Sequence, residues 1–118
     1  MRARRVPLIL AALLLAATAA FHLTGLSMVS GWFEGAKRTI MILLWVTPAL
    51  SWLLIAAFWL FKAVHGVTMD WSVLLLTAAI PLLVGAPLLT LVSVAHPGGW
   101  MLLAACALAL LSRRRGAR

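Results

Sequence analysis

Four long stretches without Asp, Glu, Lys or Arg limit what this chain can fold into more than any other feature. They cover residues 6–29, 39–61, 71–94 and 100–112. A hydrocarbon core about 30 Å thick needs roughly 20 apolar residues in a helix, and the first three stretches reach that length. The fourth stretch has 13 residues, or about 20 Å of helix, and local thinning of the bilayer accommodates it. We therefore predict an all-α, polytopic transmembrane four-helix bundle with a short fourth helix.

The overall composition excludes the other structural classes. Of 118 residues, 65% are hydrophobic and 10% are charged, whereas a soluble domain is about half apolar and about a quarter charged. The chain has two acidic residues, too few to help solvate a water-soluble surface. Disorder requires low hydrophobicity, so that class is excluded as well. We expect residues 1–118 to form a single integral membrane domain without a soluble domain.

The net charge of +8 predicts the orientation of the chain in the membrane. Most basic residues lie in the two tails, at Arg2, Arg4, Arg5, Arg113, Arg114, Arg115 and Arg118. If both tails and the connection 62–70 share one side, that side holds all of the basic residues except Lys37 and Arg38. By the positive-inside rule, this places both termini in the cytoplasm of a bacterial-type inner membrane, in contact with anionic headgroups. No basic patch suited to nucleic acid is predicted.

The N-terminus has a second interpretation, a cleaved signal peptide. Residues 1–5 are basic, residues 6–16 are apolar, and Ala17-Thr18-Ala19 resembles a cleavage site. The apolar character continues past this site to Val29, which is long enough for a complete span. We therefore favour an uncleaved first helix over a mature chain that begins near Ala20.

Small residues at four-residue spacing predict a packing face on the first helix. They are Ala12, Ala16, Ala20 and Thr24. Such stripes let helix backbones approach closely in lipid. The face serves either a homodimer or packing within the chain.

The second helix carries a stripe of indoles at Trp45, Trp52 and Trp59. A seven-residue spacing drifts only about 20° per step, so the three lie on one face. Trp52 falls near the middle of the bilayer, where its indole N–H needs an acceptor, and we expect that acceptor on a neighbouring helix. The stripe is either a packing surface or a platform for a cofactor such as a quinone.

Prolines interrupt the second and third helices. We expect kinks at Pro48, Pro81 and Pro87, with Gly85 adding flexibility to the third helix. Asp70 directly precedes the third helix, where its side chain is expected to cap the first free N–H groups.

Polar side chains near the predicted outer face are the remaining candidates for a site. They are His22, Glu34, Lys37, Arg38 and His96. Three interpretations of this cluster follow. The two histidines are axial haem ligands, or they bind a metal with Glu34, although a metal site needs three or four ligands. In the third, His22 bonds locally to a carbonyl or to Glu34, and Glu34 and Arg38 form an i, i+4 pair.

No catalytic motif is present: the sequence contains no P-loop, GxSxG, HExxH or paired carboxylates. Cys106 stands alone and is expected to be a buried, inert side chain. In length and number of spans the chain resembles the small multidrug resistance transporters, which work as dimers. That resemblance implies a glutamate within the first helix, where this sequence has none, so no site carries over.

These observations favour a membrane protein that is not an enzyme. We expect it to have no metal or cofactor and to act by packing its helices with itself or with a larger membrane complex. A minimal transporter or channel that uses the outer polar residues is the first alternative. A haem or quinone binder is the second.

Overall fold

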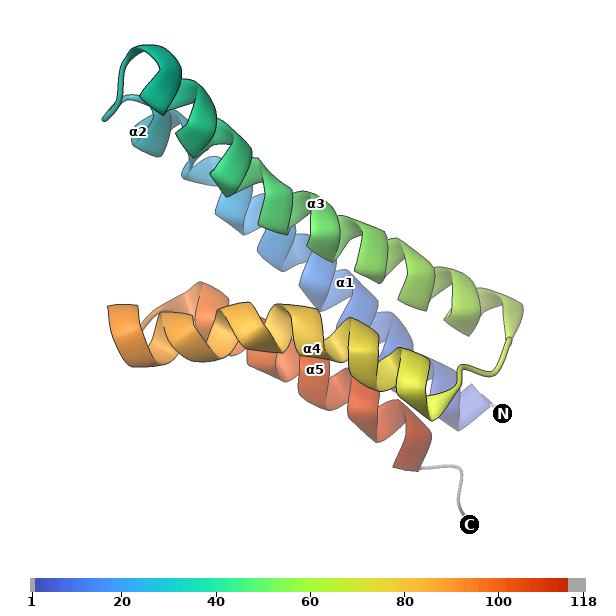
Figure 1. Cartoon of the computed structure of the whole chain (residues 1–118). Helices are drawn as coiled ribbons and strands as arrows, with labels where there is room; N and C mark the ends of the chain where they lie inside the picture. The colour runs from blue at the N-terminus through green and yellow to red at the C-terminus, as the bar shows by residue number, and fades with distance from the viewer. Residues whose placement is uncertain (1, 115–118) are drawn as a thin grey trace.

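The computed structural model describes residues 2–114, and the side chains of residues 5–113, as a purely helical structure without strands (Figure 1). Its elements are α1 (Arg2–Thr24), α2 (Leu26–Ser30), α3 (Gly35–His65), α4 (Trp71–Pro87), the π-helical segment η1 (Leu88–Val92) and α5 (Pro97–Arg114). Three segments are long and apolar enough to cross a membrane: Arg5–Ser30, Gly35–His65 and Trp71–Val92. The prediction of four apolar helices is confirmed.

The fourth helix is longer than the sequence indicates. It begins at Pro97 rather than Trp100 and has 18 residues, which correspond to about 27 Å. Proline is favoured in the first turn because its missing N–H has no partner there in any helix. Gly98 and Gly99 are therefore part of the first helical turn.

The four long helices form an open array rather than a closed ring. Helix α1 packs between α3 and α5, and α4 packs on the other side of α5. Helices α3 and α4 are not among the extensively packed pairs. They start together at their short connection and diverge along their length (Figure 1). We call the end that carries residues 66–70, the start of α1 and the end of α5 the basal end, and the opposite end the open end.

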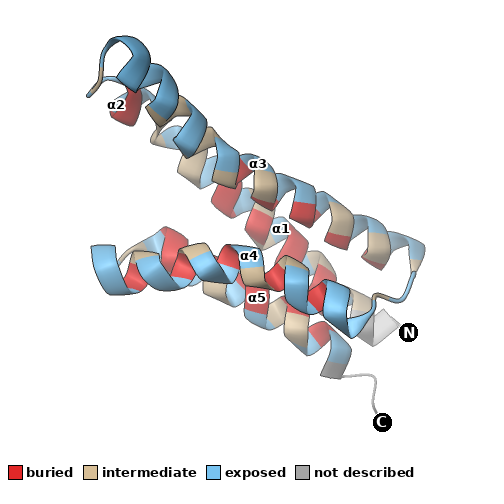
Figure 2. Cartoon of the chain, viewed as in Figure 1, coloured by how far each residue is buried: buried red, intermediate tan, exposed pale blue. Residues whose placement is uncertain are grey.

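Large and small side chains alternate on the buried face of α3. Trp52 and Trp59 are 1% and 0% exposed, and Ala49, Ala56 and Ala63 are buried between and beside them. Each indole lies seven residues from the next and each alanine fills the intervening turn, so the face is a continuous seam. The buried residues of Figure 2 follow this seam where α3 meets α1. Trp52 and Trp59 are therefore packed within the chain.

The packed face of α1 differs from the predicted stripe. Ala12 is buried, but Ala16 is half-buried, and Ala20 and Thr24 are exposed. The buried residues follow a 3.5-residue repeat instead: Leu8, Ala11, Ala12, Leu15, Thr18 and Ala19. That repeat matches the seven-residue spacing of the indoles opposite, because both helices must keep one seam facing the other. Residues spaced exactly four apart instead drift around the helix and leave this seam.

Pro48 and Pro81 do not end their helices, whereas the α-helical part of the third span ends at Pro87. Helix α3 continues through Pro48, and α4 contains both Pro81 and Pro87 before it widens into η1. Gly85 is a packing point between α4 and α5, since a Cβ there would lie 3.0 Å from Cβ of Leu102 and 3.3 Å from the Gly99 carbonyl. The glycine thus brings two backbones together.

Basic side chains surround the connection at the basal end. Arg113 donates to the Met69 carbonyl at 2.8 Å, and the Arg5 guanidinium packs against Gly66. Asp70 occupies the N-cap position of α4, but the expected side-chain cap is not formed. Its backbone carbonyl accepts from the Leu74 N–H at 3.0 Å instead.

Candidate functional site

A pair of reciprocal hydrogen bonds joins His22 of α1 to Trp45 of α3. The His22 Nε2 donates to the Trp45 carbonyl at 2.9 Å, and the Trp45 indole donates to the His22 carbonyl at 2.8 Å. The two rings stack with centroids 4.4 Å apart and an interplanar angle of 10°. Gly25 permits this approach, because a Cβ at that position would lie 3.0 Å from the indole. His22 is therefore held rigidly against α3.

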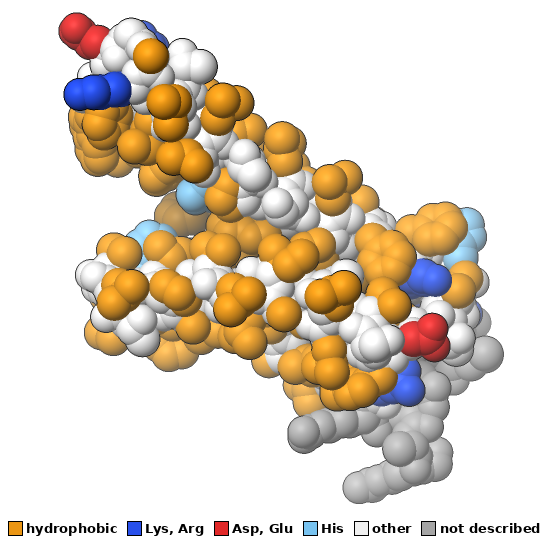
Figure 3. Space-filling model, viewed as in Figure 1, with side chains coloured by type: hydrophobic (Ala, Val, Ile, Leu, Met, Phe, Trp, Pro, Cys, Tyr) orange, Lys and Arg blue, Asp and Glu red, His pale blue; other side chains and the backbone are white. Residues whose placement is uncertain are grey.

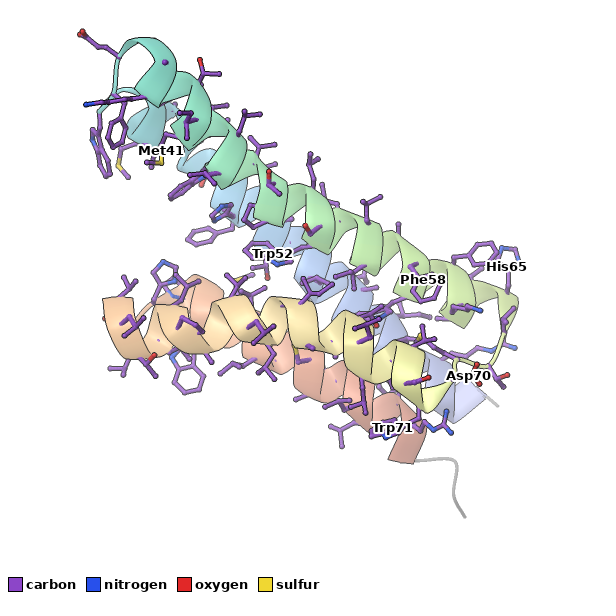
Figure 4. The ribbon with its side chains drawn as sticks, viewed as in Figure 1. Met41, Trp52, Phe58, His65, Asp70 and Trp71 are labelled. Atoms are coloured by element: carbon purple, nitrogen blue, oxygen red, sulfur yellow. The ribbon has the colours of Figure 1, made fainter. Side chains whose placement is uncertain are left out.

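Trp52 lies next to this pair and has an unsatisfied polar atom. Its ring meets His22 edge to face at 5.2 Å, and its indole nitrogen is buried without any hydrogen-bond partner among the described residues. The expectation of an acceptor on a neighbouring helix is therefore wrong for Trp52. The indole that has one is Trp59, whose N–H donates to the Thr77 hydroxyl of α4 at 2.9 Å. Through its contact with His22, Trp52 is thus on the side of α3 that packs against α1, and Figure 4 labels its position.

His96 caps α5. Its Nδ1 accepts a hydrogen bond of 3.4 Å from the backbone N–H of Gly99, three residues after it in the sequence. The side chain of a Ser or Asn cap accepts in the same way. An imidazole nitrogen that accepts has no proton, so the neutral ring carries its proton on Nε2. His96 is thus a structural cap with one remaining donor.

His22 and His96 lie on opposite walls of a notch at the open end. Phe21 and His96 both lie within 4 Å of the position that a Cβ on Gly98 would take. Figure 3 shows histidine side chains on both sides of the hollow between the diverging arms. We call the surface formed by Phe21, His22, Trp45 and His96 the open-end notch.

The other three predicted polar residues lie apart from the notch. Glu34, Lys37 and Arg38 are exposed at the start of α3, and Glu34 precedes Trp45 by about 16 Å of helix. Between Glu34 and Arg38 there is a backbone hydrogen bond of 3.4 Å. The structure brings His22 and His96 together but does not add the charged residues to them.

The two histidines are poorly arranged for haem or metal ligation. The His22 Nε2 already donates to a carbonyl, which leaves Nδ1 as the ligating atom. The His96 Nδ1 accepts from Gly99, so its Nε2 carries a proton and offers no lone pair. No group of three metal-ligating side chains lies together among the residues that the structure describes. In this conformation the notch offers a metal one coordinating atom, the Nδ1 of His22.

Sequence reasoning did not identify Thr77, Gly25 or the alternating alanines of α3. The sequence alone could have identified the alanines, because Ala49, Ala56 and Ala63 each follow a tryptophan by four residues. Thr77 and Gly25 act through partners on other helices, and no local pattern marks them.

Cys106 is buried in α5, as predicted, and its thiol donates to the Ala78 carbonyl of α4 at 3.2 Å. It lies within the packed α4–α5 pair and apart from the notch.

Comparison with known proteins does not extend this description: no family model matches the chain, and searches of curated proteins and of solved structures find no match.

Proposed function

We propose that the chain is a multi-pass protein of a bacterial-type inner membrane, with both termini in the cytoplasm. Its apolar helices and its largely apolar outer surface support membrane insertion. The basal end carries Arg5, Lys62 and Arg113, whereas the open end carries Lys37 and Arg38. With the basic tails included, the positive-inside rule directs the basal end to the cytoplasm. The open-end notch then faces the outer leaflet.

We propose further that the protein has no catalytic role and acts by binding an apolar helix of a partner between α3 and α4. One observation carries this proposal: α3 and α4, which would close a four-helix ring, are linked by the Trp59–Thr77 hydrogen bond and diverge beyond it. The partner is either a second copy or a subunit of a larger membrane complex. Helix association in lipid is driven by such packing rather than by hydrophobicity.

The surface that receives the partner follows from the register of α4. Thr77 points toward α3, since it accepts from Trp59. Val84 and Leu88 are seven and eleven residues further on, which places them on the same face of the helix. Both are half-buried against the core, whereas Leu83 is 73% exposed on another face.

Site-specific photo-crosslinking in the native membrane tests this proposal. A photoreactive residue at Val84 or Leu88 is expected to give one protein adduct of defined mass, and the same residue at Leu83 is expected to give none. Two differently tagged copies distinguish a homo-oligomer from a foreign partner. Equal crosslinking from Leu83 and Val84, or a chain that runs only as a free monomer in mild detergent with no adduct, contradicts the proposal.

A second candidate function is the binding of a small apolar molecule with a carbonyl oxygen, such as a quinone. The indole N–H of Trp52, which is buried beside His22 and has no partner within residues 5–113, favours it. A buried donor without an acceptor costs about 1–3 kcal/mol, which a ligand oxygen would recover. Chromatography of the lipid extract from purified protein tests this: the quinone should co-purify with the parent chain and be lost from Trp52→Phe. An absorbance scan of the same sample without a Soret band excludes haem.

A further inference from the structure

An apolar groove opens on the outer surface of the α4–α5 pair at the basal end. Its volume is about 400 Å³, and it is lined by Trp71, Leu75, Ala107, Leu110 and Leu111. The groove lies between two helices that pack tightly elsewhere, because Ala107 is too small to fill the space beside Trp71 and Leu75. Trp71 is 44% exposed, so the groove is accessible from the surroundings (Figure 4).

A positive charge is fixed at the mouth of this groove. The Arg113 guanidinium lies over the Trp71 ring, 5.9 Å from its centroid, and donates to the Met69 carbonyl at 2.8 Å. A guanidinium has five N–H donors in a rigid plane, and one bond to a carbonyl leaves the others free to bind a phosphate. The contacts with Trp71 and Met69 fix the orientation of the arginine before any ligand binds.

The groove and the arginine together match one end of a phospholipid. Trp71 and Leu75 are four residues apart, so the groove extends about 6 Å into the hydrocarbon from the level of the arginine. The site thus has an apolar part in the hydrocarbon and a cationic part at its mouth. A phospholipid has the matching order, with an acyl chain in the hydrocarbon and an anionic phosphate on the glycerol above it. The Arg113 charge favours a lipid with net negative charge over one whose amine cancels the phosphate.

We propose that this groove binds the upper part of one acyl chain of an anionic diacyl phospholipid, with its phosphate on Arg113. The site rests on the membrane insertion proposed above. It is independent of the surface between α3 and α4, since it lies on the outer face of the α4–α5 pair. Trp71 shields the charge–phosphate contact from water on one side.

Native mass spectrometry of the detergent-solubilised chain with added phosphatidylglycerol or phosphatidylcholine tests this site. The parent chain is expected to retain one phosphatidylglycerol in preference to phosphatidylcholine. Arg113→Gln is expected to weaken phosphatidylglycerol binding about fivefold, since a basic residue near an anionic headgroup contributes about 1 kcal/mol. Ala107→Phe fills the groove and should abolish the single tightly bound lipid of either class.

Two matched variants control for charge and bulk. Lys62→Gln removes one positive charge from the same end, and Ala57→Phe adds the same ring to an exposed position of α3. Both should retain the lipid. Equal retention of the two lipids by the parent chain, or equal losses in Arg113→Gln and Lys62→Gln, overturns the proposal. Release of the chain from membranes by carbonate, with no lipid of either class bound, would instead show that membrane insertion itself is wrong.

Discussion

Trp52→Phe and Trp59→Phe form a matched pair that separates packing from hydrogen bonding in the α1–α3 seam. Both indoles are at least 99% buried and occupy equivalent positions of the same seven-residue repeat. The two substitutions therefore remove similar volume and apolar contact. They differ in one respect: the Trp59 N–H donates to Thr77 at 2.9 Å, whereas the Trp52 N–H has no acceptor in the part of the chain that the structure describes.

This difference sets the sign and the size of the expected effect. Trp59→Phe loses a hydrogen bond between helices, worth about 0.6 and at most about 1.7 kcal/mol in membrane proteins. Trp52→Phe removes an unsatisfied buried donor, which relieves about 1–3 kcal/mol. We therefore expect Trp59→Phe to lower the free energy of unfolding by about 2–5 kcal/mol more than Trp52→Phe does.

Unfolding in mixed micelles, followed by circular dichroism as the fraction of denaturing detergent rises, measures both variants against the parent chain. Linear extrapolation gives the free energies, and equal slopes show that the same structure unfolds. The reasoning is refuted if Trp52→Phe is destabilised as much as Trp59→Phe. Thr77→Val serves as a control, because it should lower the stability of the parent chain but not that of Trp59→Phe.

Three further predictions address other contacts. His96→Ala should lower stability by about 1 kcal/mol through loss of the α5 cap, and His96→Asn should restore it, as the same unfolding assay will report. Gly99→Ala places a Cβ 2.7 Å from the Leu89 side chain and should lower stability by about 1–3 kcal/mol, whereas the exposed Ala104→Leu should change it by less than about 0.5 kcal/mol. The intact mass of the purified chain should include residues 1–19, because these contain the buried face of α1; a mass that begins near Ala20 would contradict this.

The number, type and approximate bounds of the helices were predictable from the sequence, because uncharged runs of this length have one stable form in lipid. The indole stripe was also readable as a packing face, since its seven-residue spacing persists through Trp45, Trp52 and Trp59. Burial of Cys106 followed from its apolar neighbours. Each of these features depends on a local or periodic signal.

Features that depend on a partner helix were not predictable. The face of α1 that packs follows the seven-residue repeat of the α3 indoles, so Ala12 of the predicted stripe is buried within the chain while Ala20 and Thr24 are exposed. Which indole N–H finds an acceptor depends on where Thr77 lies in space. The early start of α5 depends on the side chain of His96, a residue type rarely considered as a cap. The divergence of α3 and α4 arises from the packing of all four helices together.

The central claim of this account, that α3 and α4 separate toward the open end, is tested most directly by distances between paired spin labels in lipid nanodiscs. In a Cys106→Ala background, one pair of labels at Val64 and Val73 lies near the basal end. A second pair at Leu44 and Leu91 lies at least two-thirds of the way from the basal end toward the open end. All four positions are exposed. The account predicts a longer distance for the Leu44–Leu91 pair. Equal distances for the two pairs would show a closed four-helix bundle and contradict it.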